Sequence, residues 1–527
     1  MATDTTDARS LGDIARIQAR ARGGRTAFVF EDRATTYAEF DRRTNQVANG
    51  LAALGVRPGD RVAYLGKNSD AYFELLFGAA KAGAVMAPIN WRLAPPEIRY
   101  IVGDAGAKAL FVGPEFIDQA RGLLPDFTSV LAVIAAEGGA ADWPDYAAWR
   151  DTQSDADPGV AVGWEDAAIQ LYTSGTTGHP KGAVLPHRAL LGPRALQKAA
   201  DTPWNRWSED DVSLVAMPVF HIGGSGWGIM GLYNGAKGVI AREFDPNRVL
   251  DFIAEDRITK MFMVPAAMQI VVRHPKAREV DFSCLKYLLY GASPIPLDLL
   301  KECMEVFGCG FVQMYGMTET SGTIVALPPE DHDPAGNRRM RSAGKALPGV
   351  ELAILDEAGA RLAPGEVGEI ATRSMANMSG YWNLPDATAL TIDADGWLRT
   401  GDAGYMDEDG YVYIHDRVKD MIITGGENVY PAEVENAIFG HPAVADVAVI
   451  GVPDAKWGEA VKAVVVRKAG AEPTPAEIIA WARERIAGYK TPKSVDFIDA
   501  LPRNASGKIL RRELREPYWA GLERRVS

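Results

Sequence analysis

Short apolar runs alternate with longer segments of helical periodicity from residue 61 to residue 316. These runs predict buried strands, and they lie at 61–65, 85–89, 109–113, 260–265, 286–293 and 310–316. Between them, Ser69 stands where an N-cap precedes an apolar helical face, and Pro95 fits the first turn of the next helix. Strands that alternate with helices predict βαβ units, whose parallel sheets are covered by helices on both faces.

The pattern changes after Gly344. Between residues 344 and 415, short alternating runs are interrupted by glycine and aspartate, which predicts β-hairpins. From Arg417 onward, helical and strand-like periods mix again. We therefore predict a domain boundary near 416–418, which divides the chain into residues 1–416 and residues 417–527.

The charge balance limits the classes of partner. The chain has 527 residues, and its 69 Asp and Glu against 56 Lys and Arg give a formal net charge of -13. This balance argues against binding nucleic acid or anionic lipid, because both require a basic surface. It does not argue against a small anion in a locally positive pocket.

Three cysteines, Cys284, Cys303 and Cys309, are too few and too unevenly spaced for a disulfide framework or a zinc site. We expect them to be small buried hydrophobic residues in a reducing compartment. No apolar run reaches the length of about 18 residues that a membrane helix needs, and no signal-peptide pattern opens the chain. The sequence therefore predicts a cytoplasmic protein without an integral membrane segment.

A loop rich in glycine and hydroxyl groups follows the strand-like run at 168–172. Residues 173–182 (TSGTTGHPKG) contain three glycines, four hydroxyl side chains and one lysine. Glycine allows successive backbone N–H groups to point at one anion, so this composition fits a phosphate-binding loop. It differs from the GxxxxGK[ST] pattern of P-loop NTPases. Taken alone, the segment fits an ordinary surface loop equally well.

Further motifs follow in a fixed order. They are YGMTET (315–320), WLRTGD (397–402), DRVKD (416–420), GGEN (425–428) and LPRNASGK (501–508). Together with the loop, they resemble the adenylate-forming superfamily of acyl-CoA synthetases, luciferases and peptide-synthetase adenylation domains. The resemblance extends from about residue 26 to 515. It implies an α/β fold whose large N-terminal domain has two parallel-type sheets and a β-barrel-like part, followed by a small mobile α+β domain.

The resemblance also implies a two-step reaction. A carboxylate attacks the α-phosphorus of ATP, pyrophosphate leaves, and the thiol of CoA then displaces AMP from the acyl-adenylate. The acid is already ionised at pH 7, so the first step needs positive charge and fixed geometry more than a strong base. Between the steps the C-terminal domain would rotate about Asp416–Arg417.

The resemblance assigns roles to individual residues. Lys508 would bridge the substrate carboxylate and the α-phosphate, His221 would gate the acid and CoA paths, Lys419 would approach the thiol, and Glu319 would bind Mg²⁺ with the Thr173 hydroxyl. Asp402 would bind the ribose. The full set of implied nucleotide and CoA contacts is Thr173, Ser174, Gly175, Thr176, Thr177, Gly178, Lys181, Gly291, Ala292, Ser293, Tyr315, Gly316, Thr318, Asp402, Arg417, Gly425, Gly426 and Glu427.

The segment MPVFH (217–221) resembles the part of the family that enters the acyl pocket. No carboxylate follows in IGGSGWG (222–228) to pair with an ammonium, which argues against an amino acid substrate. Gly223, Gly224 and Gly226 leave room there, and Trp227 either closes or lines the tunnel. We predict a ligase for medium- to long-chain fatty acids. Cinnamate-type, aryl or alicyclic acids, a carrier protein as acceptor, and a homodimer stay open.

Overall fold

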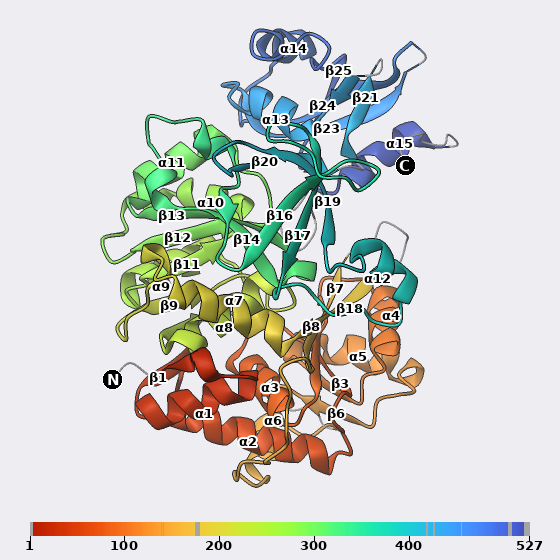
Figure 1. The fold of residues 1–527 in the computed structure, drawn as a ribbon. Coiled ribbons are helices and arrows are strands. Elements are labelled where there is room, and N and C mark those ends of the chain that lie inside the picture. The colour runs from red at the N-terminus through yellow and green to blue at the C-terminus, as the bar shows by residue number, and fades with distance from the viewer. Residues whose placement is uncertain are drawn as a thin grey trace.

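The computed structural model describes residues 4–138, 140, 142–173, 180–417, 420–424, 427–454, 456–503 and 509–520. Their strands form four sheets (Figure 1). The first has the order β18-β8-β7-β4-β3-β5-β6, with parallel pairing from β7 to β6 and antiparallel pairing at β8 and β18. Its strands are β3 (Arg61–Leu65), β4 (Val85–Pro88), β5 (Ala109–Val112), β6 (Ala132–Ala135), β7 (Ala167–Thr173), β8 (Lys181–Pro186) and β18 (Gly380–Tyr381).

The second sheet has the order β15-β14-β13-β12-β11-β9-β10-β1-β2. It is parallel from β13 to β1, and β14, β15 and β2 add antiparallel edges. Its strands are β1 (Thr26–Phe30), β2 (Arg33–Thr36), β9 (Val212–Val215), β10 (Lys237–Ile240), β11 (Lys260–Met263), β12 (Tyr287–Gly291), β13 (Gly310–Met317), β14 (Gly322–Leu327) and β15 (Lys345–Ala346).

Two mainly antiparallel sheets complete the fold. One contains β16 (Val350–Leu355), β17 (Gly368–Ser374), β19 (Leu398–Met406) and β20 (Val412–Arg417). The other lies at the C-terminal end, at the top of Figure 1, and contains β21 (Ile422–Thr424), β22 (Glu427–Val429), β23 (Val444–Asp454), β24 (Gly458–Arg467) and β25 (Ser494–Ile498). The predicted α/β class with a β part is confirmed.

Helices cover the sheets. They are α1 (Leu11–Arg22), α2 (Tyr37–Ala53), α3 (Asp70–Lys81), α4 (Pro95–Ala105), α5 (Ile117–Leu123), α6 (Tyr146–Asp151), α7 (His187–Ala199), α8 (Ile222–Asn234), α9 (Pro246–Glu255), α10 (Pro265–Val272), α11 (Leu297–Phe307), α12 (Pro385–Thr391), α13 (Pro431–Phe439), α14 (Pro475–Arg483) and α15 (Arg511–Trp519). Ser69 caps α3 by accepting from the Tyr72 N–H, as predicted. The interval from 344 to 415, predicted as hairpins alone, also contains α12. No helix among the described residues is long and apolar enough to cross a membrane.

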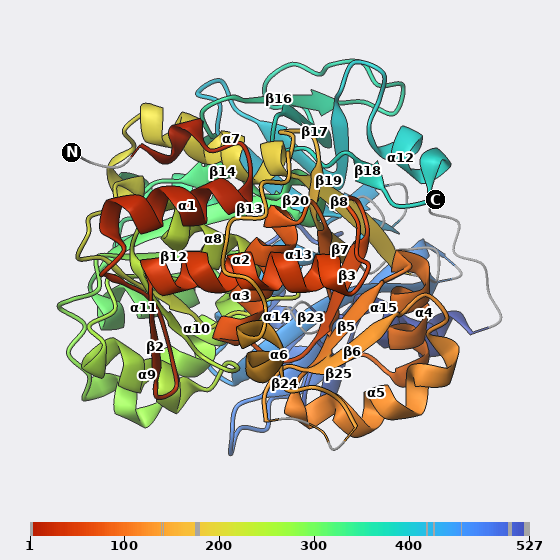
Figure 2. The same ribbon diagram turned by 90° about the horizontal axis from the view of Figure 1, so that it is seen from below.

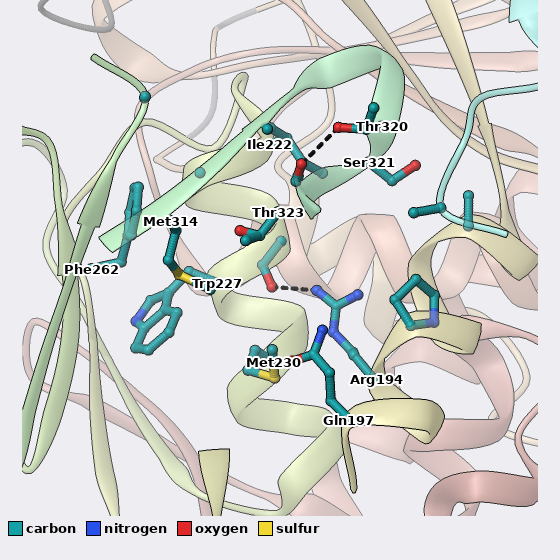
Figure 3. Close-up of a pocket in the computed structure, with 18 residues that line it drawn as sticks. Arg194, Gln197, Ile222, Trp227, Met230, Phe262, Met314, Thr320, Ser321 and Thr323 are labelled. Atoms are coloured by element: carbon teal, nitrogen blue, oxygen red, sulfur yellow. Dashed lines mark hydrogen bonds between the residues drawn. The ribbon is translucent and has the colours of Figure 1, made fainter. Parts of the chain in front are cut away.

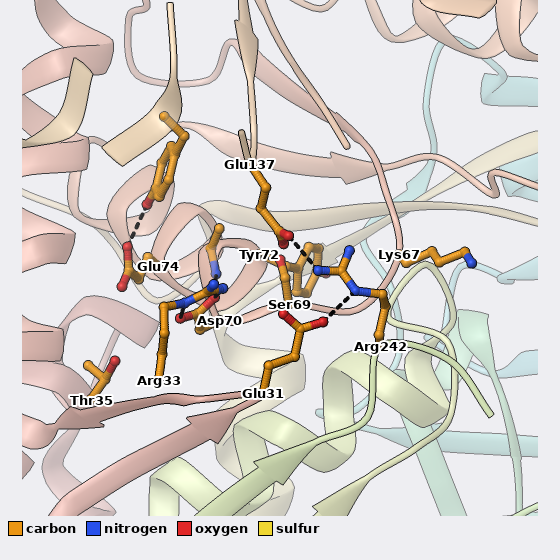
Figure 4. Close-up of polar contacts among 12 residues, drawn as sticks. Glu31, Arg33, Thr35, Lys67, Ser69, Asp70, Tyr72, Glu74, Glu137 and Arg242 are labelled. Carbon is orange, nitrogen blue, oxygen red and sulfur yellow. Dashed lines mark hydrogen bonds and ion pairs between the residues drawn. The ribbon is translucent and has the colours of Figure 1, made fainter. Parts of the chain in front are cut away.

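Helix α3 lies between the two parallel sheets (Figure 2), and every one of its residues is buried. Its Phe73 packs on Phe28 of β1 with ring centroids 4.9 Å apart. A polar network lies beside it (Figure 4), in which Arg242 pairs with Glu31 and Glu137, and Arg33 pairs with Asp70 at 2.8 Å. Glu137 follows β6 of the first sheet and Arg242 follows β10 of the second, so this ion pair joins the two sheets, and Arg33 of β2 ties the second sheet to α3. The two sheets therefore form one packed body.

Candidate functional site

Glu319 is the centre of a polar cluster. It lies in the short 3-10 turn η6 (Thr318–Thr320) that follows β13, and its residue is only 6% exposed. The Tyr381 hydroxyl donates to Glu319 Oε1 at 2.8 Å, and the Thr173 hydroxyl lies 3.4 Å from the same oxygen. Lys181 Nζ lies 5.0 Å from the centroid of the Tyr381 ring. The chain therefore brings together three of the predicted phosphate and metal ligands, Thr173, Lys181 and Glu319.

The backbone explains why Tyr381 reaches this cluster. Strand β18 pairs with β8, so that Tyr381 lies opposite Ala183, two residues beyond Lys181. The Met378 N–H donates to the Glu319 carbonyl oxygen at 2.8 Å, which ties the segment before β18 to η6. Sequence reasoning missed Tyr381 because a two-residue strand has no detectable periodicity, and only the long-range pairing identifies it.

The cluster fits Mg²⁺ bound together with a nucleotide. Among the described residues there is no group of three or more His, Cys, Asp and Glu that could hold a metal ion. One carboxylate and one hydroxyl is nevertheless the set expected for Mg²⁺, which keeps several waters and takes its remaining ligands from substrate phosphates. Glu319 and Thr173 would hold the ion, which supplies positive charge to the phosphates.

Asp402 forms a second polar centre on β19. The Tyr315 hydroxyl donates to Asp402 Oδ2 at 2.8 Å, which joins two residues that the motifs assign to the nucleotide. A bulge in β19 before Asp402 is held by Glu369, which accepts from the Gly401 N–H at 3.0 Å and from Arg399 at 2.8 Å. Gly401 has φ of 72°, a left-handed conformation that favours glycine.

The predicted adenine-flanking segment lies beside Tyr315. Gly291 ends β12, next to Met314 in the parallel register of β12 and β13, and a Cβ on Gly291 would lie 2.0 Å from the Met314 carbonyl oxygen. Ala292, with φ of 68°, turns the chain away from the sheet and is exposed, and Ser293 follows it. At Gly316 a Cβ would lie 1.8 Å from the Gly322 carbonyl oxygen. These glycines allow close backbone approach at the carboxyl ends of β12 and β13.

His221 is the N-cap residue of α8, and burial lowers its pKa to about 4, with Arg92 acting in the same direction. Its imidazole is therefore neutral at pH 7. Within the described part of the chain, its Nε2 has no hydrogen-bond partner. Asn68 holds the segment before it, because its side chain donates to the Met217 carbonyl at 3.1 Å and accepts from the Val219 N–H at 3.0 Å.

A pocket lies between α7, α8 and the β13–β14 turn (Figure 3). Its apolar lining includes Ile222, Trp227, Met230, Phe262 and Met314, and its polar lining includes Arg194, Gln197, Thr320, Ser321 and Thr323. Trp227 lines the pocket, and its Nε1 donates to the Leu214 carbonyl at 3.0 Å. Of the glycines expected to leave room, Gly223 and Gly226 line the pocket.

Gly224 has a different role from the one expected. A Cβ there would lie 2.2 Å from the Pro218 carbonyl oxygen, so this glycine allows the start of α8 to pack on the preceding segment. Arg194 and Gln197 were not identified from the sequence, because both lie on a helix whose alternation of apolar and polar residues is that of any surface helix.

Several predicted residues lie outside the described residues. They are Ser174, Gly175, Thr176, Thr177, Gly178, Lys419, Gly425, Gly426 and Lys508. Arg417 is the last residue of β20, where its backbone pairs with Asp402. Glu427 opens β22 and is exposed.

The chain matches known families along most of its length. A family model described as AMP-binding enzyme matches residues 15–382, and one described as AMP-binding enzyme C-terminal domain matches residues 433–508. The chain is 44% identical over 505 residues to fatty acid–[acyl-carrier-protein] ligase ScoC of Streptomyces coeruleorubidus, covering 95% of each chain. It is 42% identical over 511 residues to feruloyl-CoA synthase of Amycolatopsis sp, covering 97% of this chain and 99% of the relative.

A comparison with solved structures gives the same family as the sequence comparisons. The crystal structure of anthranilate CoA ligase AuaEII in complex with anthranoyl-AMP matches with a TM-score of 0.89 at 30% identity, covering 97% of each chain. The chain therefore belongs to the AMP-binding enzymes, the adenylate-forming superfamily that its motifs resemble. It is an enzyme of the acid–thiol ligase class.

Proposed function

We propose that this protein is an ATP-dependent ligase that activates a carboxylic acid as an acyl-adenylate and transfers the acyl group to the thiol of CoA. One observation carries the proposal. The β13–η6–β14 turn presents Tyr315 and Glu319 to the polar clusters, and its Gly316 and Thr320–Thr323 line the neighbouring pocket. A nucleotide bound at the clusters and an acid bound in the pocket would therefore meet at one turn.

In the first step, a carboxylate oxygen bonds to the α-phosphorus while the bond to pyrophosphate breaks. Both reactants are anions, so catalysis depends on placed positive charge. Lys181 and the Mg²⁺ held by Glu319 would stabilise the phosphates, and Asp402 would accept hydrogen bonds from the ribose hydroxyls. Lys508 would bridge the carboxylate and the α-phosphate, as the family resemblance implies.

In the second step, the thiol sulfur bonds to the acyl carbon, its proton is released, and AMP leaves. His221 directly precedes Ile222, which lines the pocket, and its ring centroid lies 4.6 Å from that of Phe220. A neutral imidazole neither attracts nor repels the charged carboxylate of the acid. His221 is therefore suited to open and close the route by which the CoA thiol would enter. The boundary at 416–417 is the proposed hinge for the change between steps.

The apolar residues of the pocket support an acyl body that is largely hydrocarbon. A medium- to long-chain fatty acid is the proposed substrate, and the 44% identical fatty acid ligase supports it. The 42% identical feruloyl-CoA synthase supports an aryl acid as the second candidate. The first relative also supports a carrier protein as the alternative acceptor.

The test is ATP–pyrophosphate exchange with a panel of alkyl and aryl acids, followed by thioester formation with free CoA or a carrier protein. The proposal is refuted if none of the acids in the panel supports ATP–pyrophosphate exchange. We expect Lys508→Ala to lower exchange by about 10²–10³-fold, because it removes a preorganised donor. Thioester formation from a supplied acyl-adenylate should largely survive, and equal loss of both half-reactions would contradict the role of Lys508.

A further inference from the structure

Arg194 brings an uncompensated positive charge to the acid pocket. It lies on α7, lines the pocket and is only 8% exposed. Its Nη2 donates to the Gly226 carbonyl at 2.8 Å, and its Nη1 donates to the Leu190 carbonyl. Its Nε has no hydrogen-bond partner among the described residues. A guanidinium has five N–H donors, and the two carbonyls accept hydrogen bonds from only two of its nitrogens, so it can donate further hydrogen bonds.

Two other buried arginines have partners that Arg194 lacks. Arg61, 8% exposed, forms no ion pair among the described residues, but its Nε donates to the Gln170 side chain at 2.9 Å and its guanidinium lies over the Trp382 ring. Arg150, also 8% exposed, pairs with Glu74 at 2.8 Å. No carboxylate in the described part of the chain forms an ion pair with Arg194, and burial lowers its pKa to about 10, which leaves it charged at pH 7. Burying a charge without a counter-charge is costly, so such a residue is expected to have a partner that the protein does not itself supply.

The position of Arg194 indicates which end of a substrate it would meet. In Figure 3, Thr320, next to Glu319, lies at one end of the pocket, and Arg194 and Gln197 lie toward the other. Trp227 and Phe262 face them across the pocket. An acid whose reacting carboxylate is near η6 would therefore direct the far end of its acyl group toward Arg194.

We propose that Arg194 binds an oxygen acceptor at the far end of the acyl group, and that the substrate is consequently a carboxylic acid with a second, remote carboxylate. A carboxylate supplies the missing counter-charge and accepts the strongest hydrogen bonds that a guanidinium makes. This inference rests on the proposed ligase function, and it narrows the substrate from a plain fatty acid to an acid with two polar ends separated by an apolar body.

The experiment compares matched acids in ATP–pyrophosphate exchange: hexanoic against adipic acid, and octanoic against suberic acid. Wild-type enzyme is expected to prefer the dicarboxylic member of each pair. Arg194→Met should lower kcat/KM for that member by about tenfold or more, mainly through KM, and change the monocarboxylic member less than about threefold. Arg194→Lys, which keeps the charge, should retain part of the preference. The matched control is Lys198→Met, an exposed cation on the same helix.

Three results would overturn the inference: no dicarboxylic preference in the wild type, equal loss for both members in Arg194→Met, or a preference that survives this change. Calorimetric binding of adipic acid without ATP provides a readout independent of catalysis, and it should weaken in Arg194→Met. If adipic acid binds through Arg194 but no acid supports exchange, the ligase proposal fails while the Arg194 site stands.

Discussion

At the scale of single residues, the site depends on side chains that fix other side chains. Tyr381 and Tyr315 each donate one hydrogen bond to a carboxylate, Glu319 and Asp402 respectively, at 2.8 Å. Both carboxylates are nearly buried, at 6% and 9% exposure. A carboxylate held in this way is already oriented before the nucleotide binds, so binding costs less side-chain conformational entropy.

Tyr381→Phe removes the hydroxyl that donates to Glu319 while keeping the ring beside Lys181. We expect the Mg²⁺ concentration for half-maximal exchange to rise about tenfold, because partners of metal ligands typically change metal affinity by 10–100-fold. KM for the acid should stay nearly constant. Titration of exchange activity with Mg²⁺ measures the effect, Tyr489→Phe at an exposed position is the control, and an unchanged titration would refute this role.

Some residues of the candidate site could be predicted from the sequence and others could not. The motifs predict Thr173, Lys181, Glu319 and Asp402 as site residues, because each stands in a motif of recognisable order. Tyr381 and Arg194 were not predicted, because their importance comes from what they contact: a carboxylate 62 residues away in the chain for Tyr381, and an unshared buried charge for Arg194. Neither property is visible in local periodicity.

At the scale of elements, the segment 217–221, which ends in His221, depends on a loop from the other parallel sheet. Asn68, 2% exposed after β3, makes hydrogen bonds to Met217, Val219 and Ala241, which lie after β9 and β10. The position of His221 therefore follows from contacts between sheets, in addition to its place at the start of α8.

Asn68→Ala leaves two carbonyls and one N–H without this partner in a buried site. We expect the free energy of unfolding to fall by about 2–3 kcal/mol, since each unsatisfied buried group is costly. Thioester formation should slow more than exchange, because the segment carries His221. Urea denaturation and the two half-reactions measure this. Asn234→Ala is the control, since Asn234 bonds within its own helix, and a similar fall in both variants would contradict the inter-sheet role.

The sequence predicted element boundaries where the hydrophobic periodicity was strong. The predictions failed where the element was short. Strands β3, β4 and β5 and the starts of helices α3 and α4 lie where the sequence placed them. Helix α12 was missed because its seven residues, PDATALT, contain two threonines and sit between glycine-rich hairpins. The antiparallel edges of both α/β sheets were not expected either, because edge pairing is decided by contacts between distant segments.

At the scale of the whole molecule, three histidines couple stability to pH. Burial lowers the pKa of His187, His221 and His332 to about 4. Their unfolded pKa is near 6.5, so the unfolded chain takes up protons that the folded chain excludes. Their contribution to stability is full above pH 6.5 and is lost as pH falls from 6.5 toward 4.

His187 is fully buried, and its Nδ1 accepts from the Leu11 N–H at 3.2 Å. Each such histidine lowers the free energy of unfolding by about 2 kcal/mol between pH 7 and pH 5. We expect His187→Gln, which retains an acceptor, to make that fall smaller by about this amount. Urea denaturation at both pH values measures it. His274→Gln, at a position that is not buried, is the control, and an unchanged pH dependence in His187→Gln would contradict the assignment.

The β13–η6–β14 turn contributes to both polar clusters and to the pocket, whereas α7 and α8 border the pocket alone. In the proposed ligase, the turn would therefore serve two binding sites and the helices one. A substitution among Thr320–Thr323 that reshapes the acid pocket also disturbs the backbone that holds Glu319, and so affects every substrate. A substitution at Arg194, Gln197 or Met230 reaches the acid alone. Divergence toward new acids is therefore least constrained along the two helices, and a search for altered specificity, in nature or in a mutant library, should concentrate its variation there.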